Sequence, residues 1–182
     1  INWDTAKSNA ASREYFGLSG YLVTVTSQTE NDFVVDKLNG EGWMGATDKA
    51  EEGTWRWVTG PEGSEDSGNG RHFFTQTGAA SNSDSLDTVY NGNSPGGGNA
   101  VGDNYENCAS NEPNDYSTGE DRAHFRTDGS WNDYANNNNN IEGYVVEYGG
   151  LADDPNVDLR DTRNVTLTAA PSVSSITRAD SD

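Results

Sequence analysis

Residues 111–121 read NEPNDYSTGED, and the chain returns to the same kinds of side chain at residues 131–133, which read WND. Three acids and an amide fall within nine residues of the first stretch, from Glu112 to Glu120. In the second stretch an amide and a further acid follow Trp131 directly. A hard cation such as Ca²⁺ takes about six to eight oxygen ligands from carboxylates, amide carbonyls and the backbone. The two stretches therefore predict a calcium site.

The order of acids and amides in these stretches indicates a ligand beyond the metal. Glu112 and Asn114 flank Pro113, and a cis X-Pro bond, which forms at modest cost, would turn both side chains toward one point. Glu120 with Asn132 repeats the pairing. A carboxylate only accepts hydrogen bonds, whereas an asparagine can give its carbonyl oxygen to an ion and still donate through its NH2 group. Two adjacent sugar hydroxyls would complete the ion's shell, so we predict that calcium and sugar bind as one unit.

Six short segments, taken in order, resemble signatures of the C-type lectin family. They are WMGATD at 43–48, EGTWRW at 52–57, EPN at 112–114, ED at 120–121, WND at 131–133 and YVVE at 144–147. The resemblance covers roughly residues 1–150. It implies an α+β C-type lectin-like fold, in which two helices flank small antiparallel sheets and a long loop region bears calcium.

Carried over position by position, the resemblance implies two sets of calcium ligands and a set of sugar contacts. The principal ion would be held by Glu112, Asn114, Glu120, Asn132 and Asp133. Auxiliary calcium would lie beside Asp48, Glu52, Asp115 and Asp121, for which the alternative is a set of solvated loop residues. The sugar would contact Glu112, Asn114, Glu120 and Asn132, with Tyr116 beside its ring. The E-P-N order implies mannose-type vicinal hydroxyls, a class that includes fucose.

The cysteine content departs from the vertebrate members of the family. Cys108 is the one cysteine in the chain, so no intrachain disulfide is possible, and we expect it to be a small core residue. Arg122 and Val146 stand where the family pattern carries cysteines. A disulfide-free chain rich in Asp, Asn, Gly and Thr resembles the ligand-binding modules of large bacterial surface adhesins. That resemblance implies an extracellular module attached to a cell surface.

The balance of charge narrows the class of partner. The chain has 30 acidic and 11 basic residues, a formal net charge of −19, which argues against nucleic acid and anionic membranes. No apolar run is long enough for direct membrane insertion. His72 and His124 are too few and too separate for a zinc site, so we expect structural histidines. Without a Cys-His or Ser-His-Asp grouping, we do not expect an enzyme.

Local patterns predict the order helix, strand, helix, strand at the start of the domain. The first helix is expected over residues 1–16, with Asp4 or Thr5 as its cap and Gly17 past its end. A strand follows at 21–26, and Ser27 with Glu30 forms a capping box for a second helix that Gly40 closes. Later strands are expected at 43–47, 55–58, 122–126 and 142–148, with a turn at 128–129. The polar, irregular stretch at 60–104 predicts an enlarged loop.

We expect two parts, a C-type lectin-like domain at 1–150 and a C-terminal extension or linker at 151–182 that leads toward a neighbouring domain. Because the chain begins at Ile1 without an initiator Met, we expect it to be part of a larger multidomain chain. Asp154, Asn156 and Asp158 would hold a linker calcium or form a solvated acidic linker, and the second is favoured. The run Asn136–Asn140 would read outer sugars or form a solvated loop, and again the second is favoured.

The sequence thus predicts a calcium-dependent carbohydrate-binding module, the ligand-binding domain of a bacterial surface adhesin. Its partners would be mannose- or fucose-type glycans on host or other cell surfaces, and its cofactor would be Ca²⁺. The alternative is a protein- or peptide-binding C-type lectin-like domain in which calcium is structural.

Overall fold

The computed structural model describes residues 1–77, 97–116, 119–137 and 140–155. Much of the enlarged loop, two of the five asparagines at 136–140, and the proposed linker ligands Asn156 and Asp158 therefore lie outside the described residues. The elements in chain order are α1 (Trp3–Ala11), β1 (Glu14–Tyr15), β2 (Leu18–Leu22), α2 (Gln28–Val35), β3 (Gly42–Thr47), β4 (Thr54–Trp57), η1 (Glu62–Ser64), α3 (Glu65–Gly68), β5 (Arg71–Gln76), β6 (Gly98–Ala100), β7 (Arg122–Phe125), β8 (Trp131–Tyr134), β9 (Gly143–Tyr144) and β10 (Val146–Tyr148).

Two predicted helices are present, with different limits. The cap of α1 is Asn2, whose side chain accepts from Thr5 N at 2.8 Å, so the prediction of Asp4 or Thr5 as cap is wrong. The helix ends at Ala11 rather than near residue 16, because Glu14 and Tyr15 pair with β2 as β1. The cap of α2 is confirmed, since Ser27 Oγ accepts from Glu30 N at 3.2 Å. The Glu30 carboxylate reaches back to Thr26 N, one residue before the cap.

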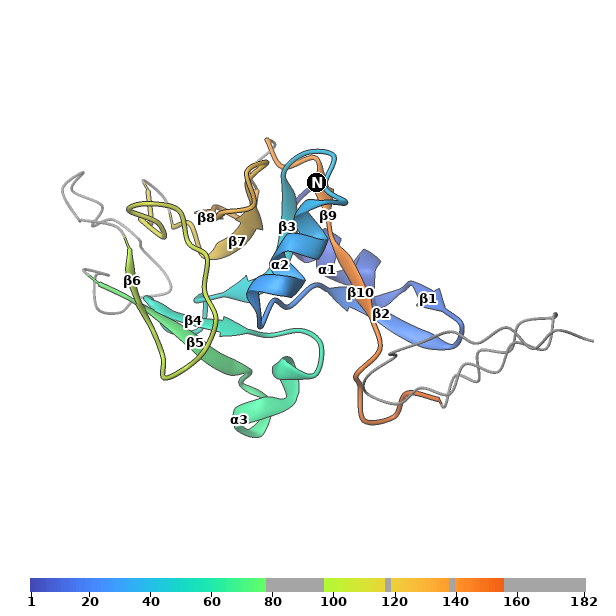
Figure 1. Ribbon diagram of the computed structural model, residues 1–182. Helices are drawn as coiled ribbons and strands as arrows, with labels where there is room; N and C mark the ends of the chain where they lie inside the picture. The colour runs from blue at the N-terminus through green and yellow to red at the C-terminus, as the bar shows by residue number, and fades with distance from the viewer. Residues whose placement is uncertain (78–96, 117–118, 138–139, 156–182) are drawn as a thin grey trace, which may run out of the picture.

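The strands form two sheets, in which all pairs but β3–β9 are antiparallel (Figure 1). The small sheet has the order β1-β2-β10, and the larger one has the order β6-β5-β4-β3-β7-β8, with β9 pairing in parallel with β3. The predicted strand at 21–26 overlaps β2 only in part, but its continuation joins the sheets: Val23 N donates to Val145 O, and Gly45 N donates to Val23 O. The expectation of an irregular loop across 60–104 is wrong at β5, which pairs with β4 and buries Phe73 and Phe74.

Trp131 lies at the centre of the larger hydrophobic cluster. Its ring meets those of Trp57, Phe73, Tyr105 and Phe125 edge-on, with centroids 5.6–6.4 Å away. Its Nε1 donates to the buried Asn31 Oδ1 of α2 at 2.9 Å. Such packing fixes the start of β8, because a buried indole usually needs both an apolar pocket and a partner for its N–H group. Residues 132 and 133 follow directly.

Arg122 fills one of the positions at which the family pattern carries a cysteine. Its guanidinium lies over the Trp3 ring of α1, 4.9 Å from the ring centroid, and donates to Thr47 Oγ1 of β3 at 2.8 Å. Arg122 therefore connects β7 to α1 and β3 without a covalent bond. Val146, at the other such position, packs against the second hydrophobic cluster. Cys108 packs against the first, as predicted, and burial raises the pKa of its thiol.

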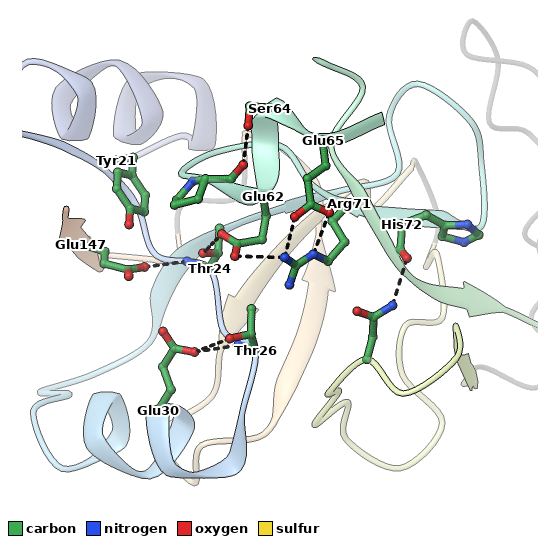
Figure 2. Close-up of polar contacts among 12 residues, drawn as sticks. Tyr21, Thr24, Thr26, Glu30, Glu62, Ser64, Glu65, Arg71, His72 and Glu147 are labelled. Carbon is green, nitrogen blue, oxygen red and sulfur yellow. Dashed lines mark hydrogen bonds and ion pairs between the residues drawn. The ribbon is translucent and has the colours of Figure 1, made fainter. Parts of the chain in front are cut away.

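Three glutamates from different elements gather around residues 24–26 (Figure 2). Thr24 N donates to Glu147 Oε2 at 3.2 Å, Thr24 Oγ1 donates to Glu62 Oε2 at 2.7 Å, and Thr26 N donates to Glu30. Burial raises the pKa of Glu147 to about 7, with the charges of Glu30 and Glu62 adding to the effect and the hydrogen bond from Thr24 opposing it. The links between these elements therefore bring acidic side chains close together.

Replacing Glu147 tests how far its buried negative charge destabilises the fold. An exposed glutamate has a pKa of about 4.3. Between that pH and about pH 7, Glu147 therefore binds more protons in the folded protein than in the unfolded chain. The free energy of unfolding falls as pH rises through this window. In Glu147→Gln the amide oxygen can still accept from Thr24 N while the charge is gone. We expect a higher melting temperature than wild type above neutral pH and a flatter pH dependence, measured by circular dichroism in chelator. The exposed Glu142→Gln should follow wild type, and parallel curves for Glu147→Gln and wild type would contradict the assignment.

Candidate functional site

The buried carboxylate of Asp133 fastens the loop at 112–116 to β8. Its Oδ1 and Oδ2 accept from Asn114 N at 3.1 and 2.9 Å, and Oδ2 also accepts from Asp115 N at 2.7 Å. The Glu112-Pro113 peptide bond, which lies within this loop, is cis. The sequence analysis predicted that it could be. The strand and the loop, whose key residues are nearly twenty positions apart in sequence, therefore meet at one point.

Two hydrogen bonds connect Glu120, at the end of the loop, to Asp115 and Tyr116. Glu120 N donates to Asp115 Oδ1 at 3.0 Å, and Tyr116 N donates to Glu120 Oε2 at 3.0 Å. The Tyr116 side chain is 58% exposed at the rim of this loop. Together with Asp133, these contacts place the residues predicted for the principal ion on one loop and the adjoining strand.

The carboxylates of Glu112, Glu120 and Asp133 repel one another. Burial raises the pKa of Glu120 to about 8, with the negative charges of Asp133 and Glu112 adding to the effect and the hydrogen bond from Tyr116 N opposing it. Burial likewise raises the pKa of Asp133 to about 7, with the Glu112 charge adding to it against the hydrogen bonds from Asp115 and Asn114. Burial also raises the pKa of Glu112, while the positive charge of Arg126 opposes that shift. A cation among these groups would relieve both the repulsion and the loss of hydration.

Three side-chain oxygens of the predicted principal set are buried without a hydrogen bond from any residue in the described ranges. They are Glu112 Oε2, Asn114 Oδ1 and Asn132 Oδ1. A buried acceptor left unsatisfied costs about 1–3 kcal/mol, and more when it is charged. Carboxylate and amide oxygens are the donors that calcium prefers. The residues present therefore fit a calcium ion.

A second acidic group lies next to the first. Carboxylate oxygens of Asp48, Glu52 and Asp121 lie within 4.8 Å of one another, which brings together three of the four residues predicted for auxiliary calcium. The fourth, Asp115, is outside this group, on the loop with Glu120. Asp48 is buried and accepts from Gly53 N at 2.9 Å. Burial, and then the charges of Glu52, Asp121 and Asp133, hold its pKa well above the usual range.

His124 contacts the site, a role that the sequence analysis did not predict. Its ring is 1% exposed, which confirms the prediction of a structural histidine, and burial lowers its pKa to about 4. Its Nε2 lies 3.2 Å from Asn132 Nδ2. The register of the β7–β8 hairpin pairs residue 124 with residue 132. Pairing across the predicted turn at 128–129 was the signal that could have found this contact.

Comparisons with known proteins show the family of this chain. A family model described as the Lectin C-type domain matches residues 2–142. The chain belongs to the C-type lectin family. As a C-type lectin domain it has the predicted α+β architecture, with one short helix, α3, beyond the two expected. None of the helices in the described part of the chain is long and apolar enough to cross a membrane.

The relatives of this C-type lectin domain are mostly much longer proteins. Halomucin of Haloquadratum walsbyi is 36% identical over 180 residues, which are 97% of this chain and 2% of Halomucin. C-type lectin domain family 4 member F of Mus musculus is 49% identical over 41 residues, 22% of this chain and 8% of that protein. Among solved structures, the carbohydrate-recognition domain of the mouse scavenger receptor C-type lectin is 18% identical with a TM-score of 0.48, covering 81% of this chain and 78% of that one.

Removing one charge from the Asp48 group should stabilise this lectin domain when metal is withheld. In Asp48→Asn the amide oxygen can still accept from Gly53 N, while the repulsion with Glu52 and Asp121 is reduced. We expect a higher melting temperature than wild type in chelator at neutral pH, and a smaller gain from added calcium. Glu51→Gln, an exposed acid in the same loop, is the matched control and should match wild type. Destabilisation of Asp48→Asn in chelator would contradict this electrostatic account.

Proposed function

We propose that this domain is a calcium-dependent carbohydrate-binding module that takes two vicinal hydroxyls of a mannose- or fucose-type sugar. One observation carries the proposal: Glu112 Oε2, Asn114 Oδ1 and Asn132 Oδ1 are buried without hydrogen bonds from the described part of the chain, at the point where the loop meets β8. Unsatisfied oxygens from three residues of one predicted ligand set support a bound cation more directly than acidity alone.

Each residue has a separate task in this proposal. Glu112, Asn114, Glu120, Asn132 and Asp133 hold the calcium ion, which when bound supplies coordination positions for two sugar oxygens. The Glu112 and Glu120 carboxylates accept hydrogens from the sugar hydroxyls, and Asn114 and Asn132 each donate to one of them. Tyr116, exposed on the same loop, lies beside the ring. The auxiliary group of Asp48, Glu52 and Asp121 binds further calcium and orders the neighbouring loop.

The calcium affinity expected of such a site and the length of a relative both support an extracellular place within a larger protein. Extracellular calcium modules have dissociation constants of about 10⁻⁴–10⁻³ M, so they fill outside cells and stay empty at cytosolic calcium. The match to Halomucin over nearly the whole chain, at 2% of that protein's length, supports a place within a large multidomain protein. We therefore propose an extracellular, surface-attached adhesion module. Domains of this family typically bind ligands and are not enzymes.

A glycan array with and without chelator tests the sugar class. We expect binding to mannose- and fucose-terminated glycans in calcium, loss of that binding in chelator, and competition by the free monosaccharides. The double substitution Glu112→Gln with Asn114→Asp exchanges acid and amide, and should weaken mannose-type binding and favour galactose. An unchanged preference would show that the diol is not read at this loop. Calcium-dependent capture of proteins that free sugar does not displace would favour the protein-binding alternative.

Calcium should also stabilise the fold. A ligand that binds only the native state adds about 2.7 kcal/mol at a concentration one hundred times its dissociation constant. We expect the melting temperature to rise in excess calcium and to return on chelation. Glu120→Gln should reduce this rise because it removes a charged ligand, and the exposed Glu142→Gln should retain it. A thermal transition in wild type that calcium and chelator both leave unaltered would contradict the metal assignment.

A further inference from the structure

The turn between β1 and β2 carries a bulky side chain where the backbone favours a small one. Phe16 and Gly17 connect the paired residues Tyr15 and Leu18, and both have a positive φ, 52° and 80°. Two-residue turns of this kind prefer Asn-Gly, because an aromatic side chain is strained at positive φ. Phe16 is 66% exposed, so little of its side chain packs against the described part of the chain. Strain that local packing does not compensate points to a functional role.

Phe16 belongs to a small aromatic patch, which is formed by Tyr15, Phe16 and Tyr148. The Tyr15 ring meets the Phe16 ring edge-on with centroids 4.5 Å apart, and its centroid lies 5.6 Å from that of Tyr148 in β10. Tyr15 is 58% exposed. In Figure 1 the β1–β2 hairpin lies on the other side of the molecule from β8, so the patch is separate from the candidate calcium site. An exposed apolar patch of this kind can mark an interaction surface.

The described part of the chain ends against this turn. A Cβ atom on Gly17 would lie 3.3 Å from Cγ of Pro155, the last residue of the described ranges. Residues 156–182 therefore begin beside the aromatic patch. An extended chain advances about 3.3–3.6 Å per residue. Val157 and Leu159, two and four positions further on, are within reach of the turn.

Residues 156–182 are suited to an apolar contact with an acidic domain. Val157 and Leu159 alternate with Asp158, a pattern typical of a segment with one apolar face. With four Asp and three Arg, the segment contributes a formal charge of only −1 to the −19 of the chain. A second copy of the chain would bring the full −19 to the patch, and this repulsion opposes self-association. The match to Halomucin covers 97% of the chain, so it includes most of this segment.

We propose that residues 156–182 dock on the aromatic patch through the apolar side chains that follow Pro155, beginning with Val157 and Leu159. Phe16 is the anchor of this contact, which compensates for its strained backbone. Docking fixes the direction in which the chain leaves the domain, on the side away from the candidate calcium site. The contact is independent of calcium and sugar binding.

Trypsin tests the proposal on the full chain, because Arg160 and Arg163 lie in the segment. Cleavage followed by mass spectrometry should be about tenfold or more slower at both sites in native wild type than in a synthetic peptide of residues 154–170, since docking lowers the population open to the protease. Phe16→Asn places the preferred residue in the turn and removes the anchor, so cleavage should approach the peptide rate. Phe33→Gln removes a phenylalanine of similar exposure, 65%, from α2 and should behave as wild type.

The double substitution Val157→Ser with Leu159→Ser lies outside the described elements and should speed cleavage at Arg163 to the same extent. Cleavage of wild type at the peptide rate would overturn the proposal. Protection that Phe16→Asn leaves unchanged would also overturn it, because the segment would then lie elsewhere. Protection that rises with protein concentration, with dimers in sedimentation that Phe16→Asn dissociates, would assign the patch to a second copy and overturn it as well.

Discussion

The hydrogen bonds from the Asn114 and Asp115 backbone to the Asp133 carboxylate are the contacts on which the candidate site depends. They bring a loop with little regular structure against a strand anchored in the core. Charged acceptors form stronger hydrogen bonds than neutral ones, so a single buried carboxylate can hold two backbone groups. The same charge also raises the pKa of Glu120 and of Asp48, so Asp133 acts on both the principal and the auxiliary acids. One carboxylate thus both holds the loop and disfavours ionisation of its acidic neighbours.

The alternation of β8 explains why a core strand can present polar ligands. Trp131 and Asp133 are buried on one side, and Asn132 and Tyr134 lie on the other, against His124. Burial of the Trp131 indole fixes the strand's rotation, and successive side chains of a strand point to opposite faces. The direction of Asn132 is therefore decided by an apolar contact made by its neighbour. The packing of the Trp131 ring and the direction of the Asn132 side chain are coupled, because the two residues are adjacent in the strand.

Local patterns in the sequence predicted much of this fold, and they selected residues that the structure brings together at the candidate site. Ser27 was identified as a cap because a capping box spans only four residues, and the strand at 43–47 was expected from its resemblance to a family signature. The limits of α1 were missed, since the β1 pairing that ends it depends on a contact and not on propensity. The strand β5 was missed because Phe73 and Phe74 lie in a polar stretch whose burial depends on β4.

Within the candidate site, the proposed ligands could be predicted from their spacing in the sequence, whereas the residues that support them could not. Asn31 bonds Trp131 from one hundred positions away, and His124 meets Asn132 only through the hairpin register. Both supports are polar groups satisfied by distant partners. Such pairings carry no short-range pattern, so the sequence alone does not show them.

Arg122 has a consequence for where this domain can mature. A cross-link made by a guanidinium stacked on Trp3 and bonded to Thr47 needs no oxidant to form and no isomerase to correct it. Reductants cannot break it, and with a single, partly buried thiol these 182 residues have no alternative intrachain disulfide to form. The contacts of Arg122 can therefore form in reducing and oxidising surroundings alike.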